Sequence, residues 1–136
     1  MKLSTKGRYG LNALYHLAQN DGKLMSLKEL SECTLVPQPY LEKLLGLLKK
    51  GGLVTSVRGV QGGYKLALDP KDISIGVALR SLENGLVFTD CAKSGTCANL
   101  NCPNQGIFKV IYDNLNDVLD SITLLDMIQK NKGAKK

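Results

Sequence analysis

Residues 53–68 read Leu53-Val-Thr-Ser-Val-Arg-Gly-Val-Gln-Gly-Gly-Tyr-Lys-Leu-Ala-Leu68, and this stretch decides the fold. Two runs rich in β-branched and aliphatic residues, 53–57 and 64–68, flank a turn that contains three glycines. Apolar runs of this length on either side of a glycine-rich turn are typical of a β-hairpin. We therefore predict two antiparallel strands here.

Two short helices are predicted immediately before the hairpin. Ser26-Leu-Lys-Glu29 is a capping box, in which the serine side chain accepts from the third backbone N–H and the glutamate bonds back. Val36-Pro37-Gln38-Pro39 breaks this helix and starts another, because proline suits the first turn of a helix but not its interior. Gly51-Gly52 ends the second helix. With a first helix over residues 8–20, the order is a helix-turn-helix followed by a hairpin, which is a winged helix.

Apolar residues in these helices recur at three- and four-residue spacing, so one face of each helix is expected to point toward a common core. The apolar residues of these helices are Leu11, Leu14, Tyr15, Leu17, Ala18, Leu27, Leu30, Leu35, Tyr40, Leu41, Leu44, Leu45, Leu47 and Leu48. Cys33 is expected to pack as a small residue within the helix that Ser26 opens, and His16 is expected at the surface or the core boundary.

The second half of the chain is predicted to add helices to this winged domain. Ser74 is expected to cap a helix that ends at residue 83, with Val77, Ala78 and Leu82 facing inward. The longest periodic run follows, from about residue 103 to 121. Its apolar residues form one stripe, Ile107, Val110, Ile111, Leu115, Val118 and Ile122. A small winged domain does not cover a stripe of this length, so we expect it to pack against the same helix of a second chain.

The predicted fold class is mostly α with a small β-hairpin, a winged helix-turn-helix domain plus a long dimerisation helix. The winged domain is expected over residues 1–83 and a cysteine-bearing loop over 84–102. The dimerisation helix and a short terminal helix, opened by a cap at Thr123-Leu-Leu-Asp126, are expected over 103–128. Residues 129–136 are expected to form a disordered basic tail.

Charge is distributed unevenly along the chain. Residues 1–70 carry ten Lys or Arg against five Asp or Glu, whereas residues 71–128 carry four against seven. The last eight residues add four lysines, and the whole chain has a net charge of +6. A basic front half points to a polyanion such as DNA, although solvated surface charge gives the same count. Together with the winged helix, it favours DNA, with Arg58 at the base of the wing suited to a narrow, electronegative minor groove.

Three of the four cysteines lie within twelve residues, at Cys91, Cys97 and Cys102. The residues between them are small and polar, with neither a helical nor a strand period, so packing does not explain the thiols. Thiolates suit zinc or iron–sulfur clusters. The gaps of five and four residues are wider than those of most zinc sites, which favours an iron–sulfur cluster over zinc or over three free thiols.

Several stretches resemble the Rrf-two family of bacterial winged-helix regulators across residues 1 to about 128. They are Lys2-Leu-Ser-Thr-Lys-Gly-Arg-Tyr9, Tyr40-Leu-Glu-Lys43, Gly52-Leu-Val-Thr-Ser-Val-Arg-Gly59 and Gly62-Gly-Tyr64. The cysteine trio is similar to that of the family's iron–sulfur branch, and the branch that regulates cysteine metabolism lacks it. The resemblance implies a homodimeric regulator of transcription that binds double-stranded DNA.

The resemblance also implies roles for particular residues. Gln38, Pro39, Glu42 and Lys43 are expected to face the major groove, with Lys43 donating to guanine and Glu42 accepting from cytosine N4. Arg58, Gly59 and Gln61 are expected to contact DNA from the wing. Lys6 and Ser26 are expected to contact the DNA backbone rather than base edges.

The implied cofactor is an iron–sulfur cluster on Cys91, Cys97 and Cys102, [2Fe–2S] in preference to [4Fe–4S]. Related chains fill the fourth ligand position of the cluster with one of two residue types, and both are absent here. Gln105 stands where a histidine is usual, and Arg8 stands where related chains carry an acidic residue. Gln105, Asn104, solvent, a small thiol and a residue of the second subunit remain alternatives for this position.

Other functional classes fit the sequence less well. There is no apolar run of 18 residues and no apolar signal core at the N-terminus, so we expect a cytoplasmic protein without a membrane partner. A thiol redox enzyme would need a CxxC pair or a general base near the trio, and the sequence has neither. The remaining alternative is a regulator of the same family that needs no metal or is stabilised by zinc.

Overall fold

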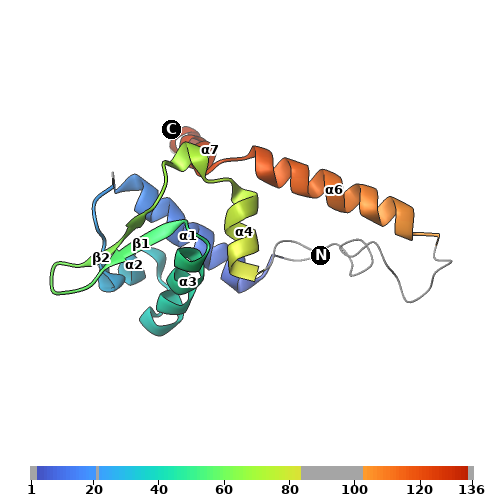
Figure 1. The fold of residues 1–136 in the computed structure, drawn as a ribbon. Coiled ribbons are helices and arrows are strands. Elements are labelled where there is room, and N and C mark those ends of the chain that lie inside the picture. The colour runs from blue at the N-terminus through green and yellow to red at the C-terminus, as the bar shows by residue number, and fades with distance from the viewer. Residues whose placement is uncertain (1–2, 21, 84–102, 135–136) are drawn as a thin grey trace.

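The computed structural model describes residues 3–20, 22–83 and 103–134. Helices α1, α2, α3, α4 and α7 and one hairpin gather around a single core, while α6 extends away from them (Figure 1). The core consists mostly of leucines, among them Leu14, Leu30, Leu41 and Leu44, all fully buried. Among the described residues, no helix is both long and apolar enough to cross a membrane.

Helix α1 spans Thr5–Gln19 and begins three residues earlier than the sequence pattern indicates. Its start is set by Ser4, whose Oγ accepts a hydrogen bond from the backbone N–H of Gly7 at 3.3 Å. The Ser4 hydroxyl also donates to Glu83, the last residue of α4. The first turn of α1 is thereby tied to the end of α4.

Helices α2, Leu27–Thr34, and α3, Gln38–Lys50, form the predicted helix pair. Ser26 caps α2 as predicted, because its Oγ accepts from the Glu29 N–H at 3.1 Å. The turn between them corrects one expectation. Leu35 is 87% exposed, not inward, because it ends α2 with φ = +60° and its side chain is directed away from the core.

Cys33 also differs from its expectation. It is exposed, since α2 buries Leu30 and Thr34 and leaves Cys33 outside that buried stripe. Thr34 satisfies its buried hydroxyl by donating to the Leu30 carbonyl oxygen at 2.7 Å. His16 is half-buried, in agreement with a position at the core boundary.

The predicted hairpin is confirmed as strands β1, Val54–Val57, and β2, Gly63–Leu66, paired antiparallel with Val54 opposite Leu66. Met25 extends this sheet, because its backbone exchanges hydrogen bonds of 2.9 and 2.8 Å with Tyr64. A side chain at position 63 would place its Cβ 2.5 Å from the Met25 carbonyl oxygen, so only glycine fits there. The hairpin is therefore joined to the residues that enter α2.

Helix α4 spans Ile75–Glu83 after a short 3-10 turn at Pro70–Asp72. Ser74 caps α4 as predicted, accepting from the Val77 N–H at 3.0 Å. Ala78 and Leu82 are buried as predicted, but Val77 is 40% exposed. The inward face of α4 is completed by Leu79 instead of Val77.

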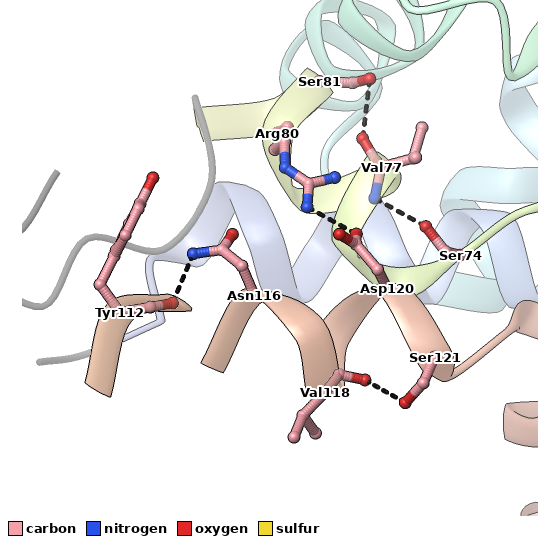
Figure 2. A network of polar contacts seen from close by, with 9 residues as sticks. All are labelled: Ser74, Val77, Arg80, Ser81, Tyr112, Asn116, Val118, Asp120 and Ser121. Carbon is pink, nitrogen blue, oxygen red and sulfur yellow. Dashed lines mark hydrogen bonds and ion pairs between the residues drawn. The ribbon is translucent and has the colours of Figure 1, made fainter. Parts of the chain in front are cut away.

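Helix α6 spans Gln105–Ser121 and has no buried residue. At its end, the Ile75 N–H donates to the Ile122 carbonyl and the Leu124 N–H donates to the Ile73 carbonyl, each at 2.8 Å. Arg80 of α4 also meets Asp120 of α6 in an ion pair of 2.5 Å (Figure 2). We call these contacts, between residues 73–80 and 120–124, the α4–α6 junction.

Helix α7 spans Leu124–Ala134 and opens with the predicted cap at Thr123. The Thr123 N–H donates to the Asp126 carboxylate at 2.9 Å, and the Asp126 N–H donates to the Thr123 hydroxyl at 3.2 Å. The expectation of a disordered tail over residues 129–136 is wrong for 129–134, which continue α7. Leu124 and Ile128 anchor that helix in the core.

Candidate nucleic-acid interface

Helix α3 is placed by its buried face, so its other face is free for recognition. Leu41, Leu44, Leu45 and Leu48 are completely buried and fix the rotation of the helix. The predicted major-groove residues lie on the opposite, exposed face, and they are Gln38, Pro39, Glu42 and Lys43. Neither Pro37 nor Pro39 donates a backbone hydrogen bond, which suits their place at the start of α3.

Tyr40 supports the front of α3 instead of joining its exposed face. It is half-buried, and its ring meets that of Tyr9 from α1 edge to face, with centroids 6.1 Å apart. Edge-to-face packing is a favourable geometry for two aromatic rings. Tyr40 therefore braces α3 against α1.

The wing carries its predicted DNA-binding residues at the turn between β1 and β2. Arg58, Gly59 and Gln61 are all exposed. Gly59 has φ = +113°, a conformation in which a side chain would be strained, so the turn needs glycine at this position. The wing glycines thus have a structural reason that does not depend on DNA.

Helix α3 and the wing enclose one groove of about 560 Å³. It is lined by Ser26, Leu27, Glu42, Gly46, Lys49, Ser56, Val57, Arg58, Gly59, Val60, Gly62, Gly63 and Tyr64. Lys49 connects the two walls, because its Nζ donates to the Ser56 Oγ at 2.7 Å. The structure therefore brings Glu42 of α3 and Arg58 of the wing to one surface.

The charges in this groove affect a tyrosine that sequence reasoning missed. Burial raises the pKa of the Tyr64 phenol above its usual value of 10.0, and the Glu42 carboxylate raises that pKa further. The Tyr64 phenol, which lines the groove, therefore keeps its proton and its donor capacity to a higher pH than an exposed tyrosine.

The two residues predicted to contact the DNA backbone, Lys6 and Ser26, are placed differently relative to this groove. Lys6 is exposed in the first turn of α1 and does not line the groove. Ser26 lines the groove, but its Oγ already caps α2. Lys49 and Val60 also line the groove, and the helical spacing of Lys49 from Glu42 is the sequence signal that indicates its place.

The predicted metal ligands Cys91, Cys97 and Cys102 lie outside the described residues. Within the described ranges, no group of three His, Cys, Asp or Glu side chains is arranged to hold a metal ion. The chain enters and leaves the cysteine segment at Glu83 and Pro103. At the start of α6, Asn104 is exposed and makes no side-chain capping bond, and Gln105 is half-buried.

The chemistry of this donor set fits an iron–sulfur cluster. Three thiolates are supplied within twelve residues, and thiolates are the usual protein ligands of such clusters. Glu83 at the entry accepts a hydrogen bond from the Ser4 hydroxyl with one carboxylate oxygen, and its other oxygen, Oε1, is buried with no hydrogen-bond partner among the described residues.

Comparison with known proteins gives consistent results. A sequence model of the Rrf2 family, described as an iron-dependent transcriptional regulator, matches residues 3–130. The HTH-type transcriptional regulator IscR of Vibrio vulnificus is 34% identical over 134 residues, which cover 97% of this chain and 80% of that protein.

Two solved structures are similar over almost the whole chain. The first is IscR of T. potens, with a TM-score of 0.79, 40% identity and coverage of 100% of this chain and 92% of that one. The second is CymR of B. subtilis, a global cysteine regulator, with a TM-score of 0.80, 34% identity and coverage of 96% and 98%. Both similarities extend to α6 and α7.

Proposed function

Because this chain belongs to the Rrf2 family of transcriptional regulators, we propose that it is a homodimer whose DNA binding is controlled by an iron–sulfur cluster on Cys91, Cys97 and Cys102. It is a regulator related to IscR and not an enzyme. A cytoplasmic location is part of the same proposal.

The DNA-binding part of the proposal is supported by the groove between α3 and the wing. A major groove admits an α-helix, α3 presents an exposed polar face, and the wing lies beside α3, where it can reach the neighbouring backbone or minor groove. Lys43 is a donor for guanine O6 and N7, while the acceptor Glu42 matches cytosine N4. Glu42 also repels phosphate, so a sequence without that cytosine leaves its carboxylate desolvated and unpaired.

The dimer is supported by α6. Ile107, Val110, Ile111, Val118 and Ile122 are each between 39% and 55% exposed in the single chain. An apolar stripe of this kind is usually covered, and the same helix of a second chain covers it with matching periodicity. Two winged domains in one dimer then contact two half-sites of an operator.

The cluster part of the proposal rests on the cysteine trio. When bound, it supplies a thiolate-ligated centre that responds to redox state, to nitric oxide or to iron–sulfur supply. In the sequence, the segment from Cys91 to Cys102 connects α4 to α6. The end of α4 is held by the hydrogen bond between Ser4 and Glu83, and α6 carries the apolar stripe that we assign to the dimer. A tenfold change in DNA affinity needs a coupling free energy of only about 1.4 kcal/mol.

The test is the visible spectrum of protein purified without oxygen, together with iron and sulfide contents. A brown protein with about two or four irons and equal sulfide per chain supports the cluster and sets its type. A colourless protein that contains zinc, or no metal, would leave a regulator of the CymR kind. That outcome would refute cluster control without affecting DNA binding.

Single substitutions identify the ligands. Cys91→Ala, Cys97→Ala and Cys102→Ala should each abolish or weaken the visible absorption, whereas Cys33→Ala should leave it intact, because Cys33 is exposed on α2. Gln105→Ala and Asn104→Ala test the fourth position, where a changed spectrum identifies the ligand. If loaded and metal-free protein bind every duplex with equal affinity, the cluster is structural and the control hypothesis fails.

A further inference from the structure

The wing presents an apolar side chain whose exposure the proposed function does not use. Val60 is 106% exposed, the highest value among the large hydrophobic residues that the structure describes. On the same hairpin, Val57 is 50% exposed. Neither contributes to the core, so folding does not explain why the wing tip is apolar.

The turn holds Val60 in one place. Val57 pairs with Gly63 at the end of the hairpin, and the Gly62 N–H donates to the Gly59 carbonyl at 3.0 Å. A side chain at position 62 would overlap the Val57 carbonyl, and Gly59 needs its positive φ of +113°. These glycines let the chain turn tightly and leave Val60 at the tip between them.

Val60 lies on the DNA side of the molecule. It lines the groove between the wing and α3, together with Glu42 and Lys49 of the recognition helix. When the outer face of α3 enters a major groove, the tip of the wing is next to an adjacent minor groove. Arg58, two residues earlier, gives the same tip a positive charge suited to that groove.

We propose that Val60 selects A·T pairs in the minor groove beside the α3 contacts, by packing its methyl groups against the deoxyribose walls and the groove floor. This inference rests on the DNA-binding function proposed above. Guanine carries its N2 amino group on the floor of the minor groove, and A·T pairs have no donor there. An apolar side chain over that amino group removes it from water without offering an acceptor, which is unfavourable. Other proteins that bind the minor groove also place apolar side chains there, as wedges between base steps.

The test uses base analogues, because they change the minor groove without changing the major groove. A duplex is first selected by the full-length protein from a random pool. Its wing-facing base pairs are then made A·T, G·C or inosine·C, where inosine lacks the N2 amino group but keeps the major-groove acceptors of guanine. We expect A·T and inosine·C duplexes to bind alike, and G·C duplexes to bind about tenfold more weakly.

Two substitutions assign the preference to Val60. Val60→Ala removes packing, and Val60→Asn supplies an acceptor for the N2 amino group, so both should reduce the tenfold preference to about twofold or less. Because Val60 is completely exposed, neither change should lower the melting temperature. The control is Leu68→Ala, since Leu68 is 46% exposed but does not line the groove, and it should keep the full preference.

The outcomes separate this inference from the proposed function. Equal binding of G·C and inosine·C duplexes, or a preference that survives both Val60 substitutions, would overturn the role of Val60. If Lys43→Ala and Arg58→Ala still weaken binding in that case, DNA binding by α3 and the wing stands. If no duplex is selected from the pool, both ideas fail.

Discussion

Replacing Ile111 by glutamate should separate the proposed dimer into monomers. Ile111 is 39% exposed on α6, within the stripe that we assign to the partner helix. Full burial of an isoleucine contributes about 1.5–3 kcal/mol, so covering the exposed part of Ile111 contributes about 1 kcal/mol per protomer. A glutamate at this position loses that contribution and must also lose its hydration, at several kcal/mol per ion.

Both protomers carry the change, so the two effects count twice in each dimer. We expect dimerisation to weaken by at least about 4 kcal/mol, or roughly a thousandfold in the dissociation constant. Adding Leu115→Lys, on the half-buried flank of the stripe, should leave no detectable dimer. The fold of each chain should persist, because α6 has no buried residue in the single chain.

Sedimentation of the full chain at micromolar concentration measures this directly. The unchanged protein should sediment as a dimer, and Ile111→Glu as a folded monomer with an unaltered circular dichroism spectrum. Leu68→Glu is a suitable control, since Leu68 has a similar exposure of 46% but lies after β2 and far from the stripe in sequence. A dimeric Ile111→Glu protein, or a monomeric unchanged protein, would show that α6 is not the interface.

Four further outcomes are expected from the groove and the helix-turn-helix. Lys43→Ala should relax base preference at one position per half-site by about 1–3 kcal/mol, while Arg58→Ala should weaken binding to all duplexes and lower its salt dependence, both measured by gel shift. Because the native pKa of Tyr64 is raised, the contribution of Tyr64 to the free energy of unfolding is complete below pH 10.0 and is lost as the pH rises through the higher native pKa. Urea unfolding at pH 8 and pH 11 should therefore show a smaller decrease in the free energy of unfolding for Tyr64→Phe than for the unchanged protein. Leu35→Asn should raise the free energy of unfolding by about 1 kcal/mol, because asparagine tolerates φ = +60° better than leucine, and a lower thermal midpoint would contradict this.

The winged helix could be predicted because its signals are local. Ser26 caps α2, Gly51-Gly52 ends α3, and the glycines of residues 59–63 mark the hairpin turn, so each boundary is specified by residues next to it. The exposed face of α3 follows from the same periodicity that places its leucines in the core.

The errors arose where a local pattern has two solutions. Leu35 continues the apolar spacing of α2, but it is also the residue that must turn the chain, and its left-handed conformation directs the side chain to solvent. Val77 and Leu79 both fit an inward position at the start of α4, and packing against the rest of the core selects Leu79. The lysines at 130 and 132 suggested a tail, although buried Ile128 holds that segment in α7.

The contact between the two walls of the groove could not be predicted from residue spacing. Lys49 and Ser56 belong to different elements, and only the angle between α3 and the hairpin brings them to 2.7 Å. The same holds for the effect of Glu42 on Tyr64. The cysteine trio stays a prediction, since Cys91, Cys97 and Cys102 lie outside the described residues.

The α4–α6 junction makes α6 a lever arm. The helix has 17 residues, or about 25 Å at 1.5 Å per residue, and the junction contacts it at its C-terminal end. A tilt of about 10° at the pivot would therefore carry the start of α6, two residues after Pro103, through about 4 Å. Conversely, a displacement of about 1 Å at Gln105 corresponds to a rotation of only about 2° at the junction. Arg80 and Asp120 sit at that pivot and share a single ion pair of 2.5 Å between half-exposed side chains. Since such a pair contributes about 0.2–1 kcal/mol, the two backbone hydrogen bonds between residues 73–75 and 122–124 supply much of the junction's resistance to tilting.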